Sequence, residues 1–226
     1  MKWTGQGWRA VTPCGWILER CMTGIFRENF IFARRTTPKV TLTGASMPRY
    51  TNRAVTTDNP EVAIVRLLAR RKLTLATAES CTGGFIAHRI TNVPGASKVL
   101  YGGIVAYGNR AKIKFLGVRA RTLERHGAVS APTAREMAEG ARKKFATDFA
   151  IAVTGIAGPG GGTKAKPVGT VFVALAGGKK TQVEKKFNPF GRLLFKRAAA
   201  SQALKLLMTA LQNSRRPSST LRLPRP

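Results

Sequence analysis

The residues best suited to chemistry lie in two glycine-bearing turns, each of which directly follows a strand-like segment. The turns read 77-TAESCTGG-84 and 154-TGIAGPGGGT-163. Open α/β sheets bind their ligands in the crevice beyond the carboxyl ends of their strands. Both turns are therefore candidate ligand sites, and they offer hydroxyl, thiol and backbone N–H groups.

Ser80 is the first candidate nucleophile. A helix is expected to begin at this serine, so the N–H groups of Cys81, Thr82 and Gly83 would lack intrahelical acceptors and could hold a phosphate or a developing oxyanion. On spacing alone an N-capping role for Ser80 is favoured, because serine commonly caps helices. The turn also matches neither a Walker loop nor a Gly-x-Ser-x-Gly elbow.

Cys81 is the rival nucleophile, because a thiol at a helix start can have a lowered pKa. It would need a base. His88 follows seven residues later, which at about 1.5 Å per residue places it about 10 Å along the helix, too far for a shared hydrogen bond. His88 is expected at the surface or in helix packing, and the sequence identifies no partner for His126.

Lys112 is the natural candidate base for Ser80, since no histidine is available. The strand end and turn 107-YGNRAK-112 place Tyr107, Asn109 and Lys112 at the mouth of the sheet. Neighbouring positive charge would lower the pKa of the lysine, and a neutral amine could accept the serine proton. Spacing does not show that the two side chains meet, so a solvated lysine and a packed tyrosine remain alternatives.

The second turn suggests binding rather than catalysis. Most of residues 154–163 are Gly, Ala or Pro, which leaves main-chain donors accessible to a ligand. Thr154 and Gly155 open this turn. A sharp loop with a purely structural role is the alternative.

The elements that must position these turns alternate between helices and strands. Apolar periodicity and capping signals predict helices over 60–71, 80–93, 132–146 and 191–211. Short apolar runs predict strands over 73–77, 98–108, 149–154, 169–176 and 181–187. This alternation predicts an α/β protein, a three-layer α/β/α sandwich around a central mixed sheet.

Composition narrows the class of protein. The chain has 226 residues and a formal net charge of +29, so polyanions and acidic substrates are the expected partners. No apolar run reaches the length of a membrane span, which predicts no membrane partner. Three cysteines, an odd number, indicate a reducing compartment, the cytoplasm. Only two histidines are present, so no metal site is expected.

The chain divides into three expected parts. Residues 58–212 should form one domain, and 213–226 a basic tail without periodicity that is expected to be disordered. Residues 1–57 carry 9 basic and 2 acidic groups and follow no regular period, so they are expected to be disordered or non-native. A targeting segment, or translation that starts at Met47, would each explain them.

Several motifs in order and spacing resemble the CinA C-terminal domain family, which includes the nicotinamide-nucleotide amidohydrolases. They are 78-AESCTGG-84, 94-PGASKVLYGGIVAYGNRAK-112, 116-LGV-118, 127-GAVS-130, 153-VTGIAGPGGGT-163 and 166-KPVGTV-171. The resemblance covers about residues 58–212. Longer members carry a large N-terminal domain that the first 57 residues cannot hold, so the chain resembles the stand-alone form.

The resemblance implies hydrolysis of the carboxamide of nicotinamide mononucleotide to nicotinate mononucleotide and ammonia, without metal or cofactor. By motif, the nucleophile falls on Ser80, the general base on Lys112 and the assisting tyrosine on Tyr107. Thr82, Gly83, Asn109, Thr154 and Gly155 are the candidates for holding the nucleotide. A homo-oligomer is also expected.

The basic charge departs from the family, whose members are commonly near neutral or acidic. Residues 58–212 alone contain 26 basic and 8 acidic side chains, a net charge of +18. Nonspecific nucleic-acid binding with weak or no amidase activity is therefore the alternative function, in keeping with the family's competence and DNA-damage associations. A basic composition without functional meaning is the other explanation.

Overall fold

A five-stranded mixed sheet forms the centre of the computed structural model, which describes residues 59–178 and 180–213. The strand order is β2-β1-β3-β4-β5; β2 and β3 run parallel to β1, and β4 and β5 are antiparallel to their neighbours. The strands are β1 (Leu75–Glu79), β2 (Leu100–Val105), β3 (Phe149–Gly155), β4 (Thr170–Ala176) and β5 (Gln182–Phe187).

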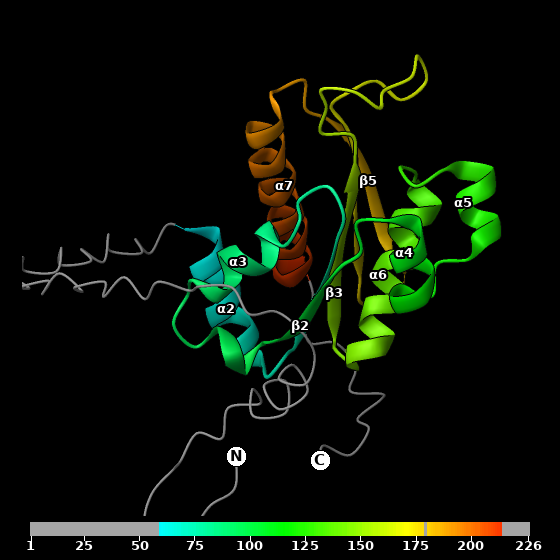
Figure 1. Cartoon of the computed structure of the whole chain (residues 1–226). Helices are drawn as coiled ribbons and strands as arrows, with labels where there is room; N and C mark the ends of the chain where they lie inside the picture. The colour runs from blue at the N-terminus through cyan, green and yellow to red at the C-terminus, as the bar shows by residue number, and fades with distance from the viewer. Residues whose placement is uncertain (1–58, 179, 214–226) are drawn as a thin grey trace, which may run out of the picture. The chain divides into compact units, whose positions relative to one another are not determined.

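Helices cover both faces of the sheet. They are α2 (Pro60–Arg71), α3 (Phe85–Thr91), the 3-10 turn η1 (Ala96–Lys98), α4 (Asn109–Leu116), α5 (Ala120–His126), α6 (Ala131–Phe145) and α7 (Arg192–Asn213). Figure 1 shows α2, α3 and α7 on one side of the strands and α4, α5 and α6 on the other. The predicted three-layer α/β/α sandwich with a mixed sheet is confirmed.

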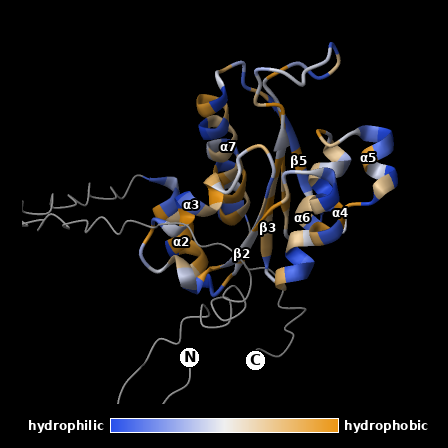
Figure 2. Cartoon of the chain, viewed as in Figure 1, coloured by the Kyte–Doolittle hydropathy of each residue, from blue (hydrophilic) through white to orange (hydrophobic). Residues whose placement is uncertain are grey.

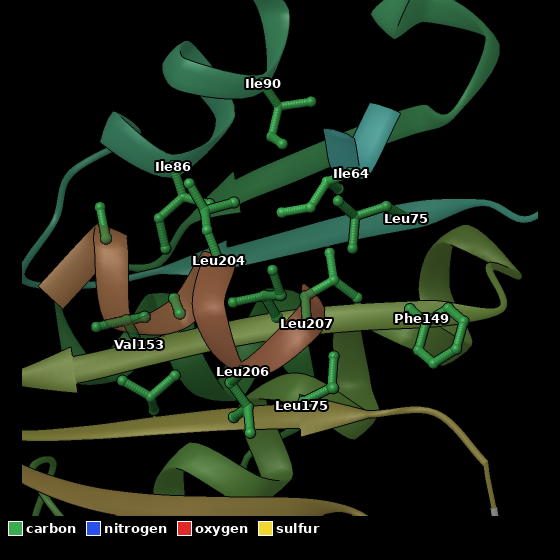
Figure 3. Close-up of a cluster of buried hydrophobic side chains, with 14 of the residues drawn as sticks. Ile64, Leu75, Ile86, Ile90, Phe149, Val153, Leu175, Leu204, Leu206 and Leu207 are labelled. Carbon is green, nitrogen blue, oxygen red and sulfur yellow. The ribbon is translucent and has the colours of Figure 1, made fainter. Parts of the chain in front are cut away.

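Alternation along the strands divides the core into two layers of different side-chain size. Leu75 of β1, Val153 of β3 and Leu175 of β4 face α2, α3 and α7 and pack in the large aliphatic cluster shown in Figure 3. The intervening alanines face α6. They are Ala76, Ala78, Ala150, Ala152, Ala174 and Ala176. The buried stripes appear as hydrophobic segments along the helices and strands in Figure 2.

Local signals explain where two of these helices begin. Pro60 stands at the first position of α2, where a missing N–H breaks no helical hydrogen bond. Ser130 precedes α6, and its Oγ accepts a hydrogen bond from the Thr133 amide at 3.3 Å. Both helices match the ranges that the apolar periodicity predicts.

The predictions were wrong in detail around the first turn and after β2. Helix α3 begins at Phe85 rather than after Ser80, because Gly83 and Gly84 adopt positive φ angles of 61° and 91° that interrupt a helix. Residues 109–112, which were expected in a turn, form the first turn of α4, and α5 was not predicted. Ser80 is therefore not an N-cap.

Two expectations concern residues outside the described ranges. They are the disorder or non-native origin of 1–57, and the disorder of the tail 213–226 apart from Asn213, which ends α7. Among the helices that the structure describes, none combines the length and apolar character that a membrane span needs.

Candidate active site

A hollow of about 200 Å³ lies where the carboxyl ends of β1 and β3 meet the first turn of α7. These segments gather at one end of the sheet (Figure 1). The side chains and backbone that line it are those of Ser80, Cys81, Tyr107, Lys112, Ala128, Val129, Thr154, Gly155, Ala157 and Arg192. The two turns that the sequence indicates therefore meet at one cavity.

Ser80 is held rigidly at the end of β1. Its amide donates a hydrogen bond to the carbonyl of Val153 at 3.0 Å, which ties it to β3, and its own carbonyl accepts from the Gly83 amide at 3.1 Å. The preceding residue, Glu79, is buried, and its carboxylate accepts from the amides of Ile86 and Ala87 at 3.0 and 2.9 Å. The turn is thus anchored on both sides of the serine.

Lys112 and Ser80 meet inside the protein. The Nζ of Lys112 lies 3.0 Å from Ser80 Oγ, 2.9 Å from the carbonyl oxygen of Ala106 and 3.0 Å from that of Tyr107. Only 1% of the lysine is exposed. The amine nitrogen therefore has three hydrogen-bond partners. Two of them are carbonyl oxygens, which can only accept hydrogen bonds.

Burial lowers the pKa of Lys112 from its ordinary value of 10.5, because the charged ammonium is desolvated. A thiolate at Cys81 would oppose this effect, but burial raises the pKa of Cys81 to about 12, so the thiol stays protonated at neutral pH. A neutral amine that donates its two N–H groups to the carbonyls of Ala106 and Tyr107 would have its lone pair left for the hydroxyl of Ser80.

The raised pKa of Cys81 corrects the expectation for the rival nucleophile. A lowered pKa requires a helix start or a nearby cation with solvent access, whereas Cys81 precedes α3 by four residues and is buried. His88, as expected, lies at the surface: it is exposed, its ring stacks on Phe85, and Asn92 contacts its Nε2 at 3.2 Å.

Tyr107 is 58% exposed and reaches the mouth of the hollow. Its hydroxyl oxygen accepts a hydrogen bond from Arg192 NH2 at 2.6 Å, and the other terminal nitrogen of Arg192 donates to the carbonyl of Gly158 at 3.0 Å. One guanidinium group therefore joins the strand end after β2, the glycine-rich loop and the start of α7.

The candidate substrate-binding residues separate into two groups. Thr154 and Gly155 line the hollow, and Thr154 Oγ1 donates to the carbonyl of Ala128 at 2.8 Å. Thr82, Gly83 and Asn109 do not line it. Thr82 is fully buried, Asn109 is exposed at the start of α4, and Gly83 lies beside Lys196, whose Nζ is 3.7 Å from the position of a Cβ built on the glycine.

Sequence reasoning missed Arg192. Nothing distinguishes it among 39 basic residues, and it follows Ser80 by more than a hundred positions. Its place at the first position of α7 could have been found only by recognising that antiparallel β4 and β5 bring the chain back to the carboxyl end of β3, where α7 begins.

Comparisons with known proteins agree with this architecture. The chain is 46% identical over 153 residues to a CinA-like protein of Pseudothermotoga lettingae, covering 68% of this chain and 38% of the relative. It is 60% identical over 122 residues to a CinA-like protein of Chloroherpeton thalassium, covering 54% and 29%. The chain thus spans about a third of the length of these curated relatives.

Solved structures match over most of their length. The competence/damage inducible protein CihA of Agrobacterium tumefaciens superposes with a TM-score of 0.64 at 40% identity, covering 69% of this chain and 97% of that one. A CinA superfamily protein of Klebsiella pneumoniae gives 0.66 at 32% identity, with coverage of 69% and 97%. The family model described as the CinA C-terminal domain matches residues 57–211. With its fold, its paired turns and these matches, the chain belongs to the CinA C-terminal domain family.

Proposed function

We propose that this domain hydrolyses the carboxamide of nicotinamide mononucleotide to nicotinate mononucleotide and ammonia, with Ser80 as nucleophile and Lys112 as general base. The observation that carries the proposal is the buried Lys112 amine 3.0 Å from Ser80 Oγ. Burial lowers the pKa of this amine and so favours its neutral form, and a neutral amine within hydrogen-bond distance of a hydroxyl can activate a serine.

The reaction follows as an acyl transfer in two halves. The neutral amine takes the Ser80 proton while Oγ bonds to the amide carbon. The C–N bond then breaks, and the nitrogen leaves as ammonia after receiving a proton. Water attacks the resulting ester, which releases the carboxylic acid and restores the Ser80 hydroxyl. The net reaction is amide plus water giving carboxylic acid plus ammonia, and it involves no oxidation or reduction.

The oxyanion of each tetrahedral intermediate needs fixed donors. The sequence suggested the amides of Cys81, Thr82 and Gly83, but the Gly83 amide already donates to the carbonyl of Ser80. Cys81 and Thr82 therefore remain the candidate donors. Tyr107 stands at the mouth, where its hydroxyl can pass a proton to the departing ammonia while Arg192 holds its oxygen.

Ammonia release from nicotinamide mononucleotide by the full chain tests the proposal. Ser80→Ala and Lys112→Met should each lower the rate by roughly 100-fold or more, the usual contribution of a nucleophile or base. Lys114→Met, an exposed lysine two positions later on α4, and Cys81→Ala should retain activity.

Trapping the acyl-enzyme intermediate tests whether Ser80 is the nucleophile. Denaturing the enzyme during turnover should leave the acyl group on the peptide that contains Ser80, as mass spectrometry detects. A folded wild-type chain that releases no ammonia, or a Ser80→Ala variant that remains active, would refute the proposal.

A second candidate function is nonspecific nucleic-acid binding, and the charge of the domain favours it. With 26 basic against 8 acidic side chains over 58–212, most basic groups have no carboxylate to pair with. Titration of a DNA duplex at several salt concentrations tests it, because phosphate contacts release counterions and make affinity fall steeply with salt. Tight, salt-sensitive binding without amidase activity would favour this function over hydrolysis.

A further inference from the structure

A second hollow of about 200 Å³ lies beside α5, on the face of the sheet that α6 covers. Its lining consists of polar and cationic side chains: Arg119, Arg121, Thr122, Arg125 and His126. Figure 2 shows α5 as one of the most hydrophilic helices of the domain. None of these residues lines the Ser80 hollow.

Arg119 is the one lining arginine whose charge is already compensated. Its amide and its guanidinium nitrogens donate to the carboxylate of Glu136, and Thr122 Oγ1 donates to the same carboxylate at 2.8 Å. Burial alone would raise the pKa of Glu136, but these hydrogen bonds outweigh it and lower the pKa. Glu136 is therefore an ionised, fully engaged partner that fixes one wall of the hollow.

Arg121 and Arg125 are the uncompensated charges. They are four residues apart on α5, so their side chains leave the helix on one side. Both are exposed, and neither forms an ion pair with a carboxylate of the described residues. Glu124 lies between them in sequence but does not line the hollow. Two unpaired guanidinium groups thus face a concave space.

We infer that this hollow binds the phosphoryl group of a small ligand. A phosphate monoester carries about −1.5 to −2 charges at neutral pH, which matches the two free guanidinium groups, and arginine donates to phosphate oxygens in a bidentate geometry that suits them. A concave space bounded by five residues fits a compact anion, whereas a polymer would need a basic stripe. The inference is independent of the proposed hydrolysis.

Calorimetric titration of the full chain with inorganic phosphate and with pyrophosphate, in chloride buffer, tests the site. Arg121→Gln combined with Arg125→Gln should weaken binding roughly ten-fold or more, because two charge-assisted contacts are lost. The matched control is Arg66→Gln with Arg70→Gln, an exposed pair of the same spacing on α2. It removes the same charge and should change affinity less than about three-fold.

Three results would overturn the inference. The first is a wild-type chain that binds neither anion at millimolar concentration. The second is an α2 pair whose loss weakens binding as much as loss of the α5 pair, which would make the effect one of net charge. The third is binding of the anions at the Ser80 hollow instead. Nicotinamide mononucleotide that displaces pyrophosphate in a Ser80→Ala background would show the last. If a DNA duplex binds in a way that depends on the α5 pair while neither small anion binds, the arginines would be a nucleic-acid contact and the inference would be wrong.

Discussion

The terminal nitrogen NH2 of Arg192 lies 2.6 Å from the hydroxyl oxygen of Tyr107, across 85 positions of sequence. Because the guanidinium group only donates, the tyrosine oxygen must accept from it, and the phenolic proton is free to point elsewhere. The contact with Arg192 thus restricts the direction in which Tyr107 can donate.

A double-mutant cycle between Arg192 and Tyr107 tests this relationship. A hydrogen bond to a charged group contributes about 1.5–3 kcal/mol, so Arg192→Gln should lower kcat for amide hydrolysis roughly 10- to 100-fold. Adding it to Tyr107→Phe should cost little more, since both remove one interaction. Arg197→Gln, exposed on the same helix, is the control. Additive losses would mean that Arg192 contacts the substrate directly.

The lowered pKa of Lys112 predicts the pH dependence of activity. In the proposed reaction the neutral amine is the active form, so kcat/KM should rise as pH increases through the lowered pKa and fall below it. A pH–rate profile measures this. A profile that is flat down to the range of carboxylate titration would contradict Lys112 as the base.

The same shift predicts the pH dependence of stability. Between the lowered folded-state pKa and the ordinary value of 10.5, the unfolded chain holds the Lys112 proton and the folded chain does not. The unfolded state then binds more protons, so the free energy of unfolding should rise with pH across this window. Urea unfolding at a series of pH values should show the rise in wild type and in Lys114→Met. Its persistence in Lys112→Met would assign it to another group.

Glu79→Gln should loosen the turn that carries Ser80. The buried carboxylate accepts two backbone amides, whereas a glutamine presents an NH2 group to one of them and leaves two donors facing each other. An unsatisfied buried group costs about 1–3 kcal/mol. Urea unfolding should show this loss, together with a lower kcat. Glu124→Gln on exposed α5 should change neither, and equal stability of the two variants would refute the anchoring role.

Gly140→Ala should destabilise the domain although alanine favours helices. A Cβ at this position of α6 would lie 1.7 Å from the carbonyl oxygen of Leu116, the last residue of α4. Overpacking costs about 1–3 kcal/mol, and a backbone clash exceeds the gain in helix propensity of about 1 kcal/mol. Because α4 carries Lys112, activity should fall as well.

Gly160→Ala is the matched control for Gly140→Ala, since no atom lies within 4 Å of its Cβ position. Thermal unfolding of the two variants beside wild type gives the comparison. A Gly140→Ala protein as stable as Gly160→Ala would show that α4 can shift without cost.

Much of the architecture could be predicted because the helices and strands that bury most side chains also show the clearest apolar spacing in the sequence. The range of α6 and the ends of β3 and β4 follow from apolar spacing and from Ser130 and Pro132. The start of α3 could not be predicted, since two glycines can either enter a helix or interrupt it, and only their φ angles decide. Helix α4 was missed because Gly108 and Asn109 are residue types that are common in turns.

The chemistry of the site could be predicted in part. With histidines excluded, Lys112 was the natural candidate base for Ser80, but their contact depends on the parallel pairing of β1 and β2, which aligns the ends of the two strands. Spacing along the chain does not encode that pairing. The contact of Arg192 with Tyr107 depends in addition on the path of the chain through β4 and β5, and no local pattern reports it.

The unequal side-chain sizes on the two faces of the sheet have a consequence for how the protein can vary among species. Exchanges among leucine, isoleucine and valine beneath α7 can be absorbed by repacking. Between the sheet and α6, the strand alanines meet Ala134, Ala138 and Ala141, with Met137 as the large side chain of the helix, so enlargement at an alanine must push the helix away. Larger residues at these alanines should therefore disturb the layer against which α4 packs, and with it the amine of Lys112.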